Sequence, residues 1–207
     1  MAREFYGYFD SVAGDEREYD AAQFAHILRA ALRNGVTSHE NGGLGVAAQG
    51  GNMDTLISPG GCVINGYLYV LSDDGGDPKR FTHPASAAND RWDRIVARLE
   101  TMTDVRKISL RLLTGTPGAN PEPPTLTRTD SVYELALAKV KIRAAAESVE
   151  EADVVDERGE ESVCGYAVPI WLDQATLDGR YIQPEMTAAQ VEELLAAADA
   201  EEGGDGE

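Results

Sequence analysis

The chain is poor in cysteine, with only two, Cys62 and Cys164, among 207 residues. Proteins that depend on a disulfide scaffold space their cysteines much more closely, so that class is excluded. One bridge is conceivable, but we expect two reduced thiols. There is no Cys-x-x-Cys pair, and the three histidines, His26, His39 and His83, are never spaced as His-x-x-x-His. The sequence therefore predicts neither a zinc site nor a cofactor.

Long apolar runs and basic residues are also scarce. No segment approaches the roughly 18 uncharged apolar residues of a membrane-spanning helix, and the first residues do not resemble a secretory signal. Eighteen lysines and arginines stand against 36 aspartates and glutamates, giving a formal net charge of −18. Phosphate backbones and anionic bilayers repel such a chain. We expect a soluble protein made in a cytoplasm, with no nucleic-acid partner and no membrane insertion.

Motifs for catalysis are missing as well. The sequence has no Gly-x-Ser-x-Gly elbow, and its glycine-rich stretch 42–51 lacks both dinucleotide-binding and Walker spacing. Adjacent carboxylates such as Asp73 and Asp74 are common, but in so acidic a chain such pairs are usually solvated. Their turn, 72–78, lacks the twelve-residue pattern of a calcium loop. We therefore assign no catalytic, cofactor-binding or metal-binding residue and do not expect an enzyme.

One amphipathic helix is predicted near the N-terminus. Asp20 is a suitable N-cap, and Asn34-Gly35 tolerates the left-handed conformation that ends many helices. These signals enclose roughly 13 helical residues. Its apolar face, which we expect to join the core, consists of Phe24, Ile27, Leu28, Ala31 and Leu32.

From Leu44 onward the helical period is lost and strands are predicted. Residues 53–58 form a first short candidate. Asn65-Gly66 then separates the apolar runs 62–64 and 67–70. Because this dipeptide accepts positive φ at both positions, it favours a two-residue hairpin turn.

The segments 94–100 and 107–112 both alternate apolar with polar residues. This pattern predicts an antiparallel hairpin with one core face and one solvated face. Arg94, Arg98 and Arg111 are then interpreted as surface residues rather than as a binding patch.

The strand that begins at Val132 changes its alternation partway along. A single flat strand would expose one of its two apolar sets, so we predict a β-bulge near Ala138-Lys139. The proline-rich segment 115–124 before it should be an extended loop between strands. The two sets are Tyr133, Leu135 and Leu137 on one face, and Val140 and Ile142 on the other.

The composition changes after Arg158 to acidic residues and glycine. Thr187-Ala188-Ala189-Gln190 has the spacing of a capping box and precedes a narrow apolar stripe, 191–198, which predicts a short helix. The acidic end, 199–207, is predicted to be disordered.

The predicted fold is mainly β, an antiparallel β-sandwich-like class with an N-terminal amphipathic helix and a short C-terminal helix. We divide the chain into an N-terminal arm and helix, 1–35, and a β-rich core domain, 36–158. A C-terminal extension, 159–207, contains the short helix and the acidic tail.

Short fragments between about residues 5 and 166 carry a family resemblance through their order. They are Gly7-Tyr8-Phe9-Asp10-Ser11-Val12-Ala13-Gly14-Asp15, Tyr19-Asp20-Ala21-Ala22-Gln23-Phe24-Ala25, Asn34-Gly35-Val36, Pro59-Gly60, Ile64-Asn65-Gly66-Tyr67, Asp93-Arg94-Ile95-Val96, Gly115-Thr116-Pro117, Leu126-Thr127-Arg128, Tyr133-Glu134-Leu135-Ala136-Leu137-Ala138, Val154-Val155-Asp156-Glu157-Arg158 and Cys164-Gly165. In this order they resemble a family of tail and baseplate proteins of tailed phages and prophages of Gram-positive hosts.

The resemblance implies a virion-proximal module of a baseplate, fibre or receptor-binding protein, a β-sandwich-like unit that is often trimeric. The expected function is that of a non-enzymatic connector or adaptor in the virion. Its expected partners are copies of itself, with a trimer favoured, and other tail or baseplate proteins. The alternative is a host-surface glycan-binding protein or, less expected, a glycan-cleaving enzyme, with Tyr67, Tyr69, Trp92 and Trp171 as available aromatics. No ligand-binding residue is assigned.

Overall fold

The computed structural model of the chain describes residues 10–14, 18–37, 43–73, 75, 77–86 and 88–170. All of them belong to one unit, which ends at Ile170. The predicted C-terminal helix and acidic tail lie outside the described residues. These residues are mainly β, in antiparallel sheets of four, three and three strands, which confirms the predicted fold class.

Helix α1, Ala21–Ala31, begins where the sequence predicted. The Asp20 carboxylate accepts the N–H of Gln23, and the Gln23 side chain accepts the N–H of Asp20, both at 2.8 Å. The helix ends earlier than expected, because Leu32 is already extended and the next N–H, of Arg33, donates to Val168 O. The expectation that the apolar face joins the core is wrong for Phe24, which is 40% exposed, whereas Ala25, outside that face, is the buried residue of the helix.

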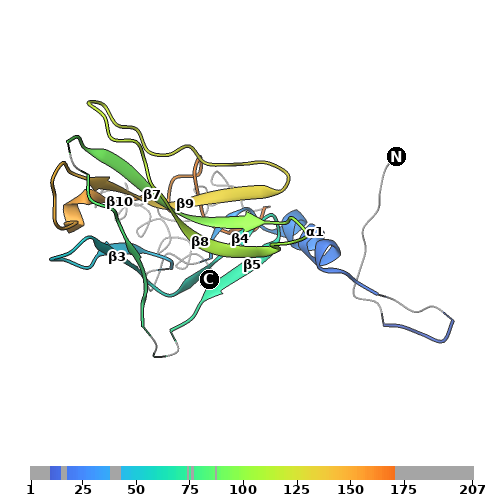
Figure 1. The fold of residues 1–207 in the computed structure, drawn as a ribbon. Coiled ribbons are helices and arrows are strands. Elements are labelled where there is room, and N and C mark those ends of the chain that lie inside the picture. Colours follow the sequence, from blue (N-terminus) through green and yellow to red (C-terminus); the bar gives the residue numbers. More distant parts are fainter. Residues whose placement is uncertain are drawn as a thin grey trace, which may run out of the picture. The chain divides into compact units, whose positions relative to one another are not determined.

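The largest sheet has the order β10-β9-β7-β8 (Figure 1). The expected hairpin is present, and the six residues between its strands form the turn. The strands are β7, Arg91–Glu100, β8, Lys107–Leu113, β9, Val132–Ile142, and β10, Val154–Asp156.

The predicted bulge lies in β9. Ile95 pairs with Ala138 but the next residue, Val96, pairs with Ala136, so Leu137 has no partner across the ladder. This extra residue reverses the alternation of side chains between the two faces of the strand. It lies one position before the predicted site, Ala138-Lys139. It brings both apolar sets to the core, which includes Leu135, Leu137, Val140 and Ile142.

The second sheet, β1-β4-β5, contains the predicted Asn65-Gly66 turn. Asn65 and Gly66 have φ angles of 51° and 81°, as a type I′ turn requires. Asn34 holds this turn: its side chain accepts the Asn65 N–H at 2.7 Å and donates to the Asn65 side chain at 3.2 Å. The strands are β1, Gly35–Val36, β4, Gly60–Ile64, and β5, Tyr67–Leu71.

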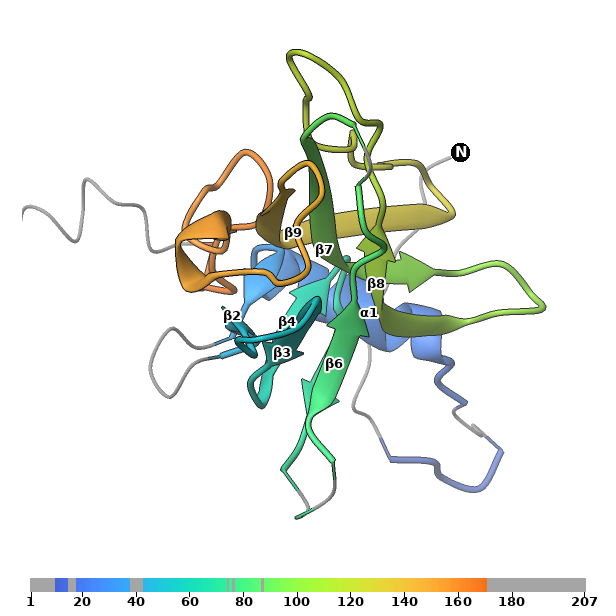
Figure 2. The same ribbon diagram turned by 60° about the vertical axis from the view of Figure 1, so that its left-hand side comes forward.

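The third sheet, β2-β3-β6, is seen best in Figure 2. Its central strand confirms the candidate at 53–58. The strands are β2, Val46–Ala48, β3, Asp54–Ile57, and β6, Lys79–Thr82, and a 3-10 turn, η2, spans Glu151–Asp153.

The core lies between the inner faces of these sheets. It takes residues from all three, for example Ile57, Cys62, Ile64, Ile95 and Leu135. In the described part of the chain, no helix has both the length and the apolar character needed to cross a bilayer.

Candidate functional site

Four buried polar side chains, from β3, β7 and the residue after β6, meet in one hydrogen-bonded network. Thr55 Oγ1 on β3 lies 3.1 Å from Nε2 of His83, which follows β6. The other ring nitrogen, Nδ1, lies 2.8 Å from the Asp93 carboxylate on β7, and Arg91 Nε donates to that carboxylate at 2.7 Å. Hydroxyl, imidazole and carboxylate in this order resemble a hydrolytic triad.

The environment of these four residues gives them a structural role. Their exposed fractions are 3% or less, so a substrate has no path to the Thr55 hydroxyl. Burial disfavours the charged carboxylate, but hydrogen bonds from His83, Arg91 and the Gly115 N–H outweigh it and lower the pKa of Asp93. The network therefore links β3, β7 and the loop after β8, and the buried charge of Asp93 is balanced by Arg91 and by hydrogen bonds.

The interpretation of the strand arginines as surface residues is wrong for Arg94. Its guanidinium binds both Glu157 carboxylate oxygens, at 2.9 and 2.8 Å, and also donates to Pro124 O at 2.6 Å. Arg94 and Glu157 are 7% and 5% exposed. Arg98 is partly covered, and its Nε donates to the fully buried Glu134 at 2.7 Å. Arg111 is exposed, as expected.

A layer of chain over the outer face of the large sheet explains this burial. Glu134 accepts the N–H of Thr127, in the loop between β8 and β9, at 2.6 Å. Arg128 from the same loop donates to Ser162 O and Val163 O, at 2.8 and 2.9 Å. The loop and the segment after β10 thus cover a face that the alternating pattern assigned to solvent.

The two cysteines are free and buried in the same core. Burial raises the pKa of each thiol to about 12, and for Cys62 the nearby Cys164 adds to the effect. Thiolate is the reactive form, so neither residue is suited to nucleophilic or metal chemistry. No cluster of candidate metal ligands occurs in the ranges that the structure describes.

Three of the aromatic residues available for glycan binding lie in the described part of the chain, on two different strands. Tyr67 and Tyr69 are half-buried on β5 and pack against the core. Trp92 lies on β7 beneath Lys139, whose Nζ is 5.6 Å from the ring centre. Trp171 lies outside the described residues.

The acidic turn 72–78 borders a cavity of about 440 Å³. Asp73 and Asp77 line it together with Lys79 and apolar residues of β3 and β5. Both aspartates are exposed, which agrees with a solvated turn.

Strand β5 presents a distinctive surface, because it is a five-residue edge strand with no charged residue and with exposed apolar side chains. Leu68 is 62% exposed and Val70 is 74% exposed. The other uncharged edge strands, β1 and β2, have only two and three residues, whereas the edge strands β8 and β6 carry charges, such as Lys107 and Arg111 on β8 or Lys79 on β6. Charges on edge strands normally prevent pairing between molecules, and β5 lacks that protection.

The backbone of β5 is also open. In a two-residue hairpin the residues that flank the turn, Ile64 and Tyr67, form a hydrogen-bonded pair, and such pairs alternate along the ladder. The peptide groups of Leu68 and Val70 therefore point away from β4, and no described residue pairs with them. One strand thus offers exposed apolar side chains and open hydrogen-bonding groups.

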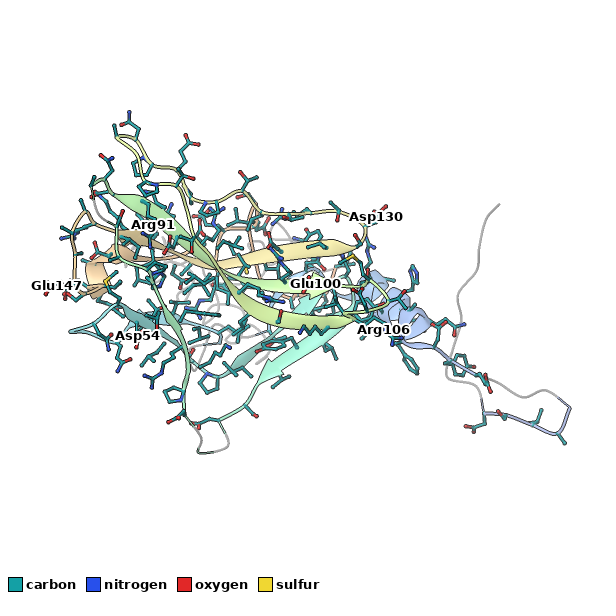
Figure 3. All side chains as sticks on the ribbon, in the orientation of Figure 1. Asp54, Arg91, Glu100, Arg106, Asp130 and Glu147 are labelled. Carbon is teal, nitrogen blue, oxygen red and sulfur yellow. The ribbon has the colours of Figure 1, made fainter. Side chains whose placement is uncertain are left out.

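One end of β5 lies beside basic residues. A cavity of about 330 Å³ is lined there by Tyr67 and Leu68 together with Arg106 and Lys107, which precede and begin β8. Figure 3 labels Arg106 at this end of the fold, near α1, with Glu100 and Asp130. The other end of β5 continues into the acidic turn at Asp73.

Sequence reasoning predicted β5 but did not identify it as a binding surface. Its pattern, Tyr67-Leu68-Tyr69-Val70-Leu71, shows no alternation of polarity, so the exposed face could not be separated from the core face.

Comparisons with protein families, with curated proteins and with solved structures find no match for this chain.

Proposed function

We propose that this protein is a non-enzymatic structural component of a phage tail end, a connector or adaptor of a baseplate or tail fibre. It acts by assembling with copies of itself and with other tail proteins. The observation that carries the assembly role is the uncharged, exposed edge of β5. The ordered fragments between about residues 5 and 166 support the phage assignment.

Electrostatics support an assembly role for β5 in particular. A chain with a formal net charge of −18 repels its own copies over most of its surface. A strand without charges, carrying Leu68 and Val70, offers contact without bringing like charges together. Natural monomers usually block such an edge, so leaving it open favours a partner strand.

The internal chemistry of the fold supports a non-enzymatic role. The residues that resemble a triad, Thr55, His83 and Asp93, are hydrogen-bonded inside the structure and not exposed in a cleft. The thiols of Cys62 and Cys164 have raised pKa values for the same reason, burial. These groups stabilise the scaffold on which the surface is displayed.

The proposal is tested by fractionating particles from a culture that produces the protein. Mass spectrometry should find the chain in purified tailed particles, at a fixed stoichiometry to the other tail proteins. Light scattering on the purified protein then gives the number of copies, for which the family resemblance favours three. Absence of the chain from washed, intact particles would overturn the tail assignment.

A further inference from the structure

We propose that two copies of this chain pair through their β5 strands, antiparallel, with Tyr69 at the two-fold axis. The inference rests on the proposed assembly function and names one of its contacts. The joined sheets would form one continuous sheet in the order β1-β4-β5-β5-β4-β1.

The backbone of β5 is self-complementary in this register. With Tyr69 opposite the partner's Tyr69, Leu68 faces Val70 of the partner subunit and Val70 faces the partner's Leu68. Both residues direct their peptide groups to the open edge. Each facing pair can therefore exchange two hydrogen bonds, as in any narrow antiparallel pair. A shift by one residue would place inward-pointing groups opposite outward-pointing ones and lose these bonds.

The side chains agree with the same register. Residues directly opposite in an antiparallel ladder lie on the same face of the sheet. The two exposed residues of each copy, Leu68 and Val70, therefore come together as a cluster of four apolar side chains. Their burial supplies the hydrophobic contribution that backbone pairing alone lacks.

The charges at the two ends of β5 are complementary. Antiparallel pairing brings the end of one strand, at Asp73, to the beginning of the other, at Tyr67. Arg106 and Lys107 lie beside Tyr67, around the cavity described above. Each copy thus places an exposed carboxylate near two basic side chains of the other, and the pair has two such contacts by symmetry. Local attraction at these ends opposes the repulsion of the net charge.

The contact is small, one strand against one strand, so we expect reversible pairing that depends on protein concentration. It is compatible with the favoured trimer, because a two-fold contact combined with a three-fold ring gives a dihedral assembly. Within a particle, many copies held close together would strengthen a weak contact.

The first test is sedimentation equilibrium from micromolar to millimolar protein, comparing wild type with Val70→Lys and Val70→Pro. Lysine adds charge to the patch, and proline removes an N–H that points to the open edge and not to β4, so both should shift the dimer midpoint to at least tenfold higher concentration. Val155→Lys on β10, where the valine is 39% exposed, is the matched control and should leave the midpoint unchanged. Circular dichroism confirms that each variant folds.

The second test fixes the register by disulfide formation. Leu68→Cys mixed with Val70→Cys should cross-link much faster than either variant alone, because these positions face each other between copies. Equal rates would overturn the register. If the wild type and Val70→Lys dimerise with the same midpoint, pairing through β5 is overturned, but self-assembly through another surface is not. A wild type that stays monomeric at millimolar concentration would also overturn the pairing, whereas the tail assignment is judged separately by the particle composition.

Discussion

Replacing Gly66 with alanine should destabilise the fold through one close contact between helix and hairpin. A Cβ at this position would lie 1.9 Å from the backbone oxygen of Ala25, in α1, and real Cβ atoms essentially never come within 3.0 Å of such an atom. The nearest atoms all belong to the backbone of Ala25 and not to a flexible side chain. The helix or the turn must therefore move by about 1 Å in a closely packed interior.

The magnitude separates into two contributions. Gly66 has a φ of +81°, where a side chain costs roughly 1–2 kcal/mol, partly offset by the lower entropy of the unfolded alanine chain. Forcing extra volume into a packed contact typically costs a further 1–3 kcal/mol or so. Gly50 has nearly the same φ, +80°, with nothing within 4 Å of its Cβ position. Gly50→Ala is therefore the matched control for the backbone contribution.

Thermal unfolding measured by calorimetry checks this reasoning. Gly66→Ala should unfold about 2–12 °C below Gly50→Ala, from 2–4 °C per kcal/mol for a chain of this size. A difference in unfolding free energy below about 0.5 kcal/mol would mean that α1 does not pack on the turn as described.

Three further predictions concern buried polar groups. Glu157→Ala leaves the Arg94 guanidinium buried without its carboxylate and should cost roughly 3–5 kcal/mol in chemical denaturation, whereas Arg94→Met with Glu157→Leu should cost far less; equal losses would contradict the ion pair. Asp93 has a lowered pKa in the folded state, so its stabilising contribution is complete above its ordinary pKa of about 4 and is lost as the pH falls towards the folded value. Over that pH range the unfolding free energy of the wild type should fall more steeply than that of Asp93→Asn. Parallel plots of unfolding free energy against pH would argue against the shift. With pKa values of about 12, Cys62 and Cys164 should react with a thiol reagent at pH 8 only as fast as the protein opens, and rapid labelling of the native state would contradict their burial.

Local signals in the sequence predicted much of the scaffold. Asp20 and Gln23 lie three residues apart and satisfy each other's backbone, so the helix start depends on neighbours in the chain. The Asn65-Gly66 turn depends on two backbone angles that these residues adopt readily. The bulge at Leu137 follows from a change of alternation within a single strand. Each feature is decided within a few residues.

Features decided by distant segments were not predictable. Alternation around Arg94 showed that two faces differ, but not that Glu157, 63 residues further along, would cover the polar face. The buried network combines Thr55, His83 and Asp93 from separate elements, so no short stretch of the sequence contains it. The open edge of β5 depends on sheet order, which no short pattern specifies.

The most direct test of the central claim is immunogold labelling of intact tailed particles with antibodies raised against this chain. Our account predicts label at the tail end, on baseplates or fibre attachment points, that is lost when the gene is deleted. Label found only on the head would contradict a structural role in the tail. So would particles that carry no label although the free protein is detected in the same preparation.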